Sequence, residues 1–429
     1  MTKFAVLIAA FALALWLPAT TNAQDVTATP CEPGLAPSRF VELAYERIEV
    51  YDFEAAISLF TCAVELDPTF AEAFMNRGAA YAVIRRNDMA LADYDRTIAL
   101  DPTYAKAYSN RGGVLLELGR YEQAIDDFTQ AIRLDPTLLA AYNNRGRASY
   151  SLDRFENALR DLNFVLSRNP DYANALYNRG NVYVGLGEYE TALEDYNRSL
   201  ELEANFPPAY SGRANAYYHL GEYELALADA NRALDLNASL AASYNIRGKI
   251  HAALDAREEA LADYNRALEL DPTLVDAFYN RGNLFVQAGL LDRAIADFDR
   301  VLEIKPEYAD GYAARGNAYG LMGEYERALD DASRAIELNP ALTEAYYNRG
   351  SIYYLQENYE DAIEDFNRAL LLEPDFAEPY LGLGLVYIDE ERFEDALLHL
   401  QHYIELMGDE VNPDIAAAVE SLEQRLSGS

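Results

Sequence analysis

Apolar and polar residues follow a helical period along most of this chain. From Pro37 to Glu410, every stretch of 34 residues contains two segments whose apolar residues recur with a period near 3.6, and both segments are too long for strands. With Pro37 counted as position 1, eleven such repeats fill 37–410. We predict one helix over positions 2–14 and a second over positions 18–30 of each repeat.

Several positions hold one kind of residue in nearly every repeat. Position 20 is Ala in all eleven repeats, position 8 is Gly in nine, and position 4 is aromatic in ten. Small residues at positions 8 and 20 allow the paired helices to approach closely, and aromatic residues at positions 4 and 24 are expected to fill the space between repeats. Gly at position 15 predicts a left-handed end to the first helix. Asp-Pro at positions 31 and 32 predicts an N-cap for the next helix.

The pattern resembles the tetratricopeptide repeat, as in AYSNRGGVLLELGRYEQAIDDFTQAIRLDPT from Ala107. The resemblance covers 374 of the 429 residues in eleven tandem copies, most of which carry Asn-Arg-Gly or a close variant at positions 6–8. It implies an all-α, right-handed superhelical solenoid whose repeats share one continuous core. It also implies protein–protein interaction, and the residues outside the repeats are too few for a catalytic domain, so we do not expect an enzyme.

The two ends differ from the repeats. Residues 1–23 carry Lys3 before a 14-residue apolar run, followed by small residues, which predicts a signal peptide cleaved after Ala23. The run is too short to span a membrane, so we expect an exported protein, in a bacterial periplasm or outside the cell, with no membrane span after cleavage. Residues 24–36 are a Thr/Pro-rich spacer, and residues 411–429 predict a capping helix over the last repeat.

The remaining chemistry is sparse. A net charge of −36 makes nucleic acid and anionic membranes poor partners; it suits either a solvated outer face or attraction of a basic partner. His399 and His402 precede Glu405 on one predicted helix, which is compatible with a metal site or with a polar cap surface. We identify no third ligand and predict neither a metal nor a cofactor. Export would permit a disulfide between Cys31 and Cys62, but the sequence does not distinguish it from two free thiols.

Arg at position 7 and Asp at position 23 occur in the same nine repeats. Both are present in repeats 2–10, and both are absent from repeats 1 and 11. This shared distribution predicts a ladder of Arg–Asp pairs, such as Arg179 with Asp195, within or between repeats. The alternative is that these side chains contact a ligand directly.

Two residue types recur on the predicted concave wall. In solenoids that resemble this one, positions 2, 5, 6, 9, 12 and 13 of the first helix face that wall. Carboxamides there can pair with peptide backbone of any sequence, and tyrosines offer rigid amphipathic contacts. The candidate peptide-binding residues are Asn76, Asn110, Asn144, Asn178, Asn181, Asn215, Asn280, Asn283, Asn317, Asn348, Tyr150, Tyr177, Tyr218, Tyr279, Tyr347 and Tyr354.

These residues predict a scaffold that holds an extended segment of a protein partner along the concave wall, above all in repeats 2–5. The competing interpretation of the asparagines is that they hydrogen-bond only their own solenoid. The competing function is a structural spacer in a cell-envelope or exopolysaccharide assembly.

Overall fold

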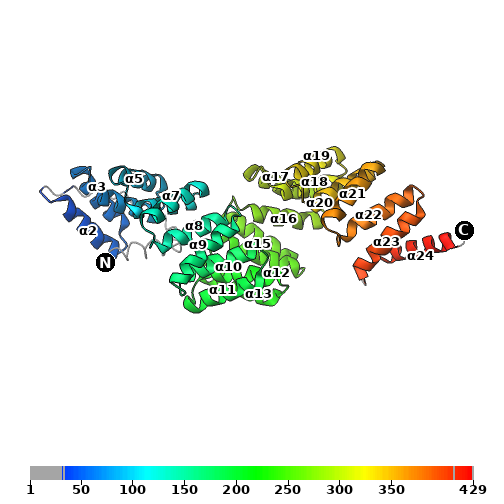
Figure 1. Cartoon of the computed structure of the whole chain (residues 1–429), viewed down its shortest axis with the longest axis horizontal. Helices are drawn as coiled ribbons and strands as arrows, with labels where there is room; N and C mark the ends of the chain where they lie inside the picture. The colour runs from blue at the N-terminus through cyan, green and yellow to red at the C-terminus, as the bar shows by residue number, and fades with distance from the viewer. Residues whose placement is uncertain (1–30, 32–33, 409–410, 428–429) are drawn as a thin grey trace. The chain divides into compact units, whose positions relative to one another are not determined.

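The computed structural model describes residues 31, 34–408 and 411–427. These residues form 23 helices, α2–α24, and no strand (Figure 1). The predicted fold class, an all-α solenoid of tetratricopeptide helix pairs, is confirmed. The predicted signal peptide lies outside the described residues, and so does most of the spacer.

The helices follow the repeat frame. Their first members occupy positions 1–13 and their second members positions 17–30 in most repeats, one residue earlier at the start than predicted. The helices are α2 (Pro37–Glu49), α3 (Phe53–Leu66), α4 (Ala71–Val83), α5 (Asn87–Leu100), α6 (Ala105–Glu117), α7 (Tyr121–Leu134), α8 (Leu139–Tyr150), α9 (Phe155–Arg168), α10 (Ala173–Gly185), α11 (Tyr189–Leu202), α12 (Pro207–His219), α13 (Tyr223–Leu236), α14 (Ala241–Ala253), α15 (Arg257–Leu270), α16 (Val275–Gln287), α17 (Leu291–Ile304), α18 (Ala309–Met322), α19 (Tyr325–Leu338), α20 (Thr343–Leu355), α21 (Tyr359–Leu372), α22 (Ala377–Asp389), α23 (Phe393–Met407) and α24 (Pro413–Ser427).

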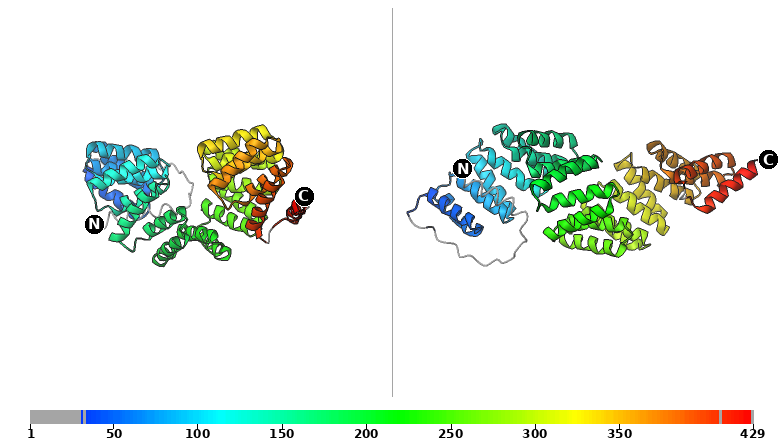
Figure 2. Two further views of the ribbon diagram at one scale, coloured as in Figure 1. Left: turned by 45° about the vertical axis from the view of Figure 1, so that its right-hand side comes forward. Right: turned by 90° about the horizontal axis from the view of Figure 1, so that it is seen from below.

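Internal contacts divide the chain into two compact units, Met1–Ile246 and Arg247–Ser429, and the division falls inside α14. From α2 to α13 and from α15 to α24, each helix packs on the helix that follows it, and first helices of neighbouring repeats also touch, as α10 touches α12 in one unit and α18 touches α20 in the other. Figure 2 shows these stacked helix pairs from two further directions. Each unit is described below by itself.

Position 15 ends the first helix in the left-handed conformation in all eleven repeats. Gly occupies it in five repeats, where φ lies between 69° and 81°, so the predicted left-handed glycine is confirmed. In the other six repeats, a residue with a side chain takes the same conformation, from φ 54° at Asp153 to φ 60° at Arg85. The turn geometry is therefore imposed by the packing of the repeat and not by glycine alone.

The predicted capping role of Asp-Pro is wrong. Asp101 ends the second helix α5, and α6 begins four residues later at Ala105 without a side-chain cap. The Oδ1 atom of Asp101 instead accepts hydrogen bonds from the backbone N–H and the hydroxyl of Thr103, at 2.9 and 2.7 Å. Asp135 and Asp271 do the same with the threonines two residues further on, so this aspartate shapes the turn between repeats.

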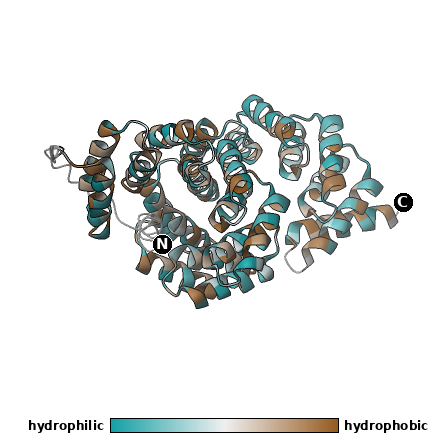
Figure 3. Ribbon diagram, turned by 60° about the vertical axis from the view of Figure 1, so that its left-hand side comes forward, coloured by the Kyte–Doolittle hydropathy of each residue, from teal (hydrophilic) through white to brown (hydrophobic). Residues whose placement is uncertain are grey.

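Small residues hold the two helices of a repeat together. A Cβ atom added to Gly180 would lie 2.7 Å from Cε1 of Tyr196, a position-24 residue that is almost fully buried. Ala at position 20 is also fully or almost fully buried in every repeat. Figure 3 shows that each helix carries both apolar and polar residues, because only one side of it faces this core.

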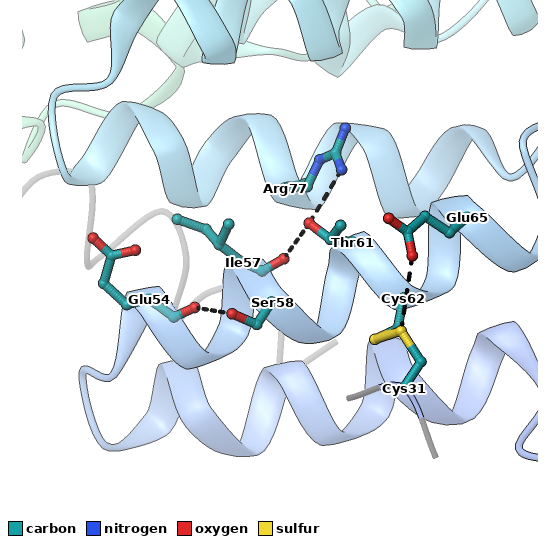
Figure 4. The surroundings of a disulfide bond; sticks show 8 residues. All are labelled: Cys31, Glu54, Ile57, Ser58, Thr61, Cys62, Glu65 and Arg77. Carbon is teal, nitrogen blue, oxygen red and sulfur yellow. Dashed lines mark hydrogen bonds between the residues drawn. A yellow bond between two sulfur atoms is a disulfide. The ribbon is translucent and has the colours of Figure 1, made fainter. Parts of the chain in front are cut away.

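The ends of the stack are covered in different ways. At the N-terminal end, Cys31 and Cys62 form a disulfide, with their Cα atoms 5.5 Å apart, which ties the segment before α2 to α3 (Figure 4). At the C-terminal end, α24 buries Val419 and Leu422 in the core cluster that includes Leu400 of α23. Over the described residues, no helix is both long enough and apolar enough to cross a membrane.

Candidate binding groove

Arg at position 7 pairs with Asp at position 23 of its own repeat in repeats 2–10. Nε and Nη2 of each arginine donate to the two carboxylate oxygens, at 2.6–2.9 Å in all nine pairs. Arg179 and Asp195 meet in this way, with both distances 2.7 Å. Each pair joins the first helix of a repeat to its second.

The same arginine also reaches the preceding repeat. Its Nη1 donates to the side-chain oxygen at position 25, as Arg77 does to Thr61 at 3.2 Å (Figure 4) and Arg179 does to Asn163 at 2.7 Å. Further bonds of this kind are formed by Arg111, Arg145, Arg213, Arg281, Arg315 and Arg349. The arginine therefore ties its own repeat to the one before it.

Position 25 could have been found in the sequence but was not singled out. Repeats 1–9 place Thr, Asp, Asn or Ser there, each of which offers a side-chain oxygen, and repeats 2–10 supply the arginines. Repeat 10 has Asn367 at position 25, but repeat 11 has Leu383 at position 7 and so offers no arginine. Asn367 instead donates to the backbone carbonyl of Ile363 in its own helix.

Burial makes this ladder part of the solenoid. The nine aspartate side chains are 5–11% exposed and the arginines 16–24%. Arg77 also lies over the rings of Phe74 and Tyr81, at 5.5 and 5.9 Å. Hydrogen bonding to Asp195 raises the pKa of Arg179. With its donors directed at neighbouring helices, the arginine has a structural role, and direct ligand contact is the weaker interpretation.

The asparagines at position 6 of unit 1 lie mostly within the solenoid. Asn76 and Asn178 are buried, and Asn178 Nδ2 donates to Asn143 Oδ1 of the preceding repeat at 2.9 Å. Asn143 in turn donates to Asn144 Oδ1 at 3.0 Å. Asn110 and Asn144 are half-buried. At position 9, Asn181 accepts a hydrogen bond from the hydroxyl of the buried Tyr196 at 2.6 Å.

Tyrosines at position 5 pack against two other aromatic residues of their own repeat. Tyr347 meets Phe376 at a centroid distance of 5.4 Å and Phe366 at 6.1 Å. Tyr177 and Tyr279 make the equivalent contacts in repeats 5 and 8. These rings are half-buried, so each has one side in the core and part of its surface in solvent.

Tyrosines at position 12 also have partners. Tyr150 contacts Phe155, and Tyr218 contacts Tyr223. The hydroxyl of Tyr354 donates to Asp389 of the next repeat at 2.9 Å, and burial together with this carboxylate raises the pKa of Tyr354 to about 12.

A cavity of about 280 Å³ lies on the wall of unit 2. All of its lining residues occupy positions 2, 5, 6, 9 or 34, and the first four of these belong to the predicted wall positions. It brings together five predicted residues, Tyr279, Asn283, Asn317, Tyr347 and Asn348. The other lining residues are Asp310, Ala313, Ala314, Leu342, Glu344, Phe376 and Glu378.

The remaining predicted asparagines and tyrosines do not line this cavity. Asn280 and Asn215 make contacts within the protein. The predicted set contained only asparagines and tyrosines, so it omitted the carboxylates at position 2, and position 34 lies outside both predicted helices.

No group of three or more potential metal ligands occurs among the described residues. His402 Nδ1 lies 3.5 Å from Glu405, and both side chains are well exposed. His399 is instead stacked on the ring of Tyr387, and burial lowers its pKa. Both histidines contact the ring of Tyr380, at centroid distances of 6.0 Å for His399 and 4.4 Å for His402.

Comparison with known families agrees with the repeat frame. Models described as tetratricopeptide repeat match residues 41–105, 105–138, 173–206, 207–240, 309–342 and 343–376, and a model described as TPR repeat matches 257–289 and 282–323. The chain belongs to the tetratricopeptide-repeat family. Five of the matched segments coincide with the 34-residue repeats counted from Pro37.

Several solved structures are similar to this chain. A tetratricopeptide repeat protein from Parabacteroides merdae is 22% identical, over 55% of this chain and 93% of its own, with a TM-score of 0.48. Yeast Tom70 is 16% identical over 91% and 96%, with a TM-score of 0.45. YrrB, described as a TPR protein with an unusual peptide-binding site, is 26% identical over 44% and 96%, with a TM-score of 0.35. Among curated proteins, none matches significantly.

Proposed function

We propose that this chain is a non-catalytic interaction scaffold that binds an extended segment of a partner protein on the wall of unit 2. The cavity lined by Asn283, Asn317 and Asn348 carries this proposal, because it gathers amide side chains and tyrosine rings in one concave place. Pockets that combine an apolar lining with a few convergent polar groups are the usual binding sites of proteins.

The chemistry of the cavity suits a peptide backbone. A carboxamide offers both a donor and an acceptor, so it can pair with the N–H and C=O groups of an extended chain of any sequence. Asn317 is exposed, and Asn283 and Asn348 are half-buried. Asn348 makes one long bond, 3.4 Å from Nδ2 to the backbone carbonyl of Ala313, so much of its hydrogen-bonding capacity is available. Tyr279 and Tyr347 would contact side chains of the segment.

The preferred place for the segment therefore moves from repeats 2–5 to repeats 8–11. In unit 1, the amide of Asn178 is already used by Asn143, and Asn76 is buried. Asn178 fits the interpretation in which the solenoid bonds itself, and Asn76 is too buried to reach a ligand. Asn110 and Asn144 are half-buried like Asn283 and Asn348, but only the asparagines of unit 2 line the cavity.

We further propose that the protein works after export, in a periplasm or outside the cell. The apolar run behind Lys3 and the disulfide between Cys31 and Cys62 support this, since disulfides persist mainly in oxidising compartments. Mass spectrometry of protein from the native host would find a chain that begins at Gln24 and has no reactive thiol. A chain that retains residues 1–23, or two reactive thiols, would contradict export.

Site-specific photo-cross-linking in the native host tests the binding proposal. A benzoylphenylalanine at Ala314, which lines the cavity, is compared with one at Leu371, which is 70% exposed on α21 and outside it. Cross-links to one partner from position 314 alone are expected. Cross-links from position 371 alone would favour the spacer function.

A synthetic peptide from the cross-linked segment then permits a binding measurement. Asn317→Ala with Asn348→Ala should weaken its binding about tenfold, at about 0.5–1.5 kcal/mol for each lost hydrogen bond. Asn367→Ala is the matched control, because this asparagine bonds only its own helix in the structure. Unchanged binding in the double variant would exclude the amide contacts.

A further inference from the structure

In repeats 8–11 of unit 2, the first helix of each repeat carries a carboxylate in its first turn, and together these residues form a row. Position 2 is Asp276, Asp310, Glu344 and Glu378 in repeats 8–11. In repeats 1–7 only one residue at this position is acidic; the seven are Ser38, Glu72, Lys106, Ala140, Asn174, Pro208 and Ala242. The row is therefore a property of one stretch of the wall and does not follow from the acidity of the whole chain.

Three of these carboxylates line the cavity. Asp310, Glu344 and Glu378 are among its twelve lining residues, and none of the twelve is basic. Asp310 and Glu344 lie close enough to Tyr279 to add to the increase in its pKa, which is due first to burial. Glu378 acts in the same way on Tyr347. Negative charge and aromatic surface thus face the same space.

Among the described residues, Asp310, Glu344 and Glu378 have no cationic partner, whereas Asp276 lies near enough to Lys249 to act on its pKa. No ion pair or side-chain hydrogen bond joins Asp310, Glu344 or Glu378 to another described group, whereas Glu303 and Glu337, on the second helices of the same unit, pair with Arg300 and Arg334. Three unpaired carboxylates in successive repeats repel one another, and a bound cation would relieve that repulsion.

We propose that the cavity binds a lysine or arginine side chain of the extended segment; this inference rests on the proposed function. The methylene groups of that side chain would lie against Tyr279, Tyr347 and Phe376, and its charged end would lie among the carboxylates. The asparagines would hold the backbone on either side. An acidic segment would be repelled by the same charges.

The size of the cavity agrees with this occupant. Its volume of about 280 Å³ is just below the ~300–1,000 Å³ of pockets that take drug-sized ligands. It therefore suits one long side chain with its adjoining backbone, and not a bulky folded element. The spacing of the carboxylates, one per repeat, suits a segment that runs along the wall.

Selection from a displayed library of random nonapeptides tests the proposal with a defined probe. The library is selected against the full-length protein and against Asp310→Asn/Glu344→Gln. The matched control is Glu303→Gln/Glu337→Gln, which removes the same charge from exposed residues on α17 and α19, outside the cavity lining. Peptides selected by the unmodified protein and by the control should be enriched in lysine or arginine at a fixed position, and the cavity variant should lose this enrichment.

The best peptide is then measured by fluorescence anisotropy. Asp310→Asn/Glu344→Gln should lower its affinity about tenfold and reduce the salt dependence of binding, while the control changes affinity less than about twofold. Equal losses in both variants would show a general effect of charge and overturn the proposal, as would selected peptides without a fixed basic residue. If such neutral peptides still require Asn317 and Asn348, the proposed function stands and only this inference fails. If no peptide depends on either set, both fail.

Discussion

Asn178 donates a hydrogen bond of 2.9 Å to Asn143 in the preceding repeat, and both side chains are buried. An asparagine at position 6 can thus connect two repeats of the solenoid and be buried away from a ligand. The same position in repeat 10 holds Asn348, which is half-buried beside the cavity. One position of the repeat therefore has two different uses along the chain.

The two uses predict losses of stability of different size when each asparagine is replaced by alanine. Asn178→Ala should lower the free energy of unfolding by about 1–3 kcal/mol, because it leaves the buried carbonyl of Asn143 without its donor. Asn348→Ala removes only the 3.4 Å bond to Ala313 and should cost less than about 1 kcal/mol. Urea unfolding followed by circular dichroism measures both. Equal losses of stability would show that the two asparagines have the same role.

The Arg–Asp ladder should be strongly coupled. Asp195→Ala leaves Arg179 without its bidentate partner in a site where the aspartate side chain is 7% exposed, so we expect a loss of about 2–4 kcal/mol. Asp171→Ala, which breaks the exposed pair with Arg198, should cost less than about 1 kcal/mol. A double-mutant cycle on Arg179 and Asp195 gives the coupling energy. Strict additivity of the two substitutions would rule out a cooperative pair.

Two glycines in adjacent repeats should respond oppositely to alanine. Gly146→Ala places its Cβ atom 2.9 Å from Cγ of Leu162 and should destabilise the protein by about 1–3 kcal/mol. A Cβ atom added at Gly113 would have no other group within 4 Å, and Gly113 lies in a helix. Gly113→Ala should therefore stabilise the protein by up to about 1 kcal/mol. Thermal unfolding of both variants distinguishes them. A lower melting temperature for Gly113→Ala would contradict the open space beside it.

Residues 204–257 should have the lowest local stability in the stack of repeats. The buried residues of α12 and α13 are nearly all small, and Ala230 stands where most repeats have a buried aromatic residue. Fewer large apolar groups interlock there, so local opening should cost less free energy. Hydrogen exchange should be at least about tenfold faster in α12–α14 than in α16–α17. Uniform protection from repeat 3 to repeat 9 would contradict this prediction. The division of the chain at Ile246 falls in the same interval.

Sequence periodicity was sufficient for the fold because each repeat restates the same physical constraints. Ala at position 20 and Gly at position 8 recur because paired helices approach closely there, so the pattern predicts the packing. The pairing of Arg with Asp was also predicted, since the two are present and absent together, but the pattern did not distinguish a partner in the same repeat from one in a neighbouring repeat.

The binding site was predicted less well from the sequence, because the surroundings of an asparagine depend on the neighbouring repeat. Asn178 is bonded because position 5 of repeat 4 is Asn143, and Asn348 is not bonded in that way because position 5 of repeat 9 is Ala313. No property of position 6 itself distinguishes them. The left-handed turn at Arg85 and Asp255 was also missed, since a side chain there gives no local signal for positive φ.

The position-7 arginine bonds both its own repeat and the preceding one, and this limits how such a chain can gain or lose residues. Eight of the nine arginines bond an aspartate of their own repeat and an oxygen at position 25 of the preceding repeat, and the sequence places a side-chain oxygen at position 25 in all of repeats 1–9. Asn367 gives repeat 10 the same capacity, although Leu383 follows it. If one whole 34-residue repeat among repeats 2–10 were duplicated or deleted, the arginine bonds between the newly adjacent repeats could therefore form again. Growth in steps of 34 residues is open to this chain, and any other step would break the ladder.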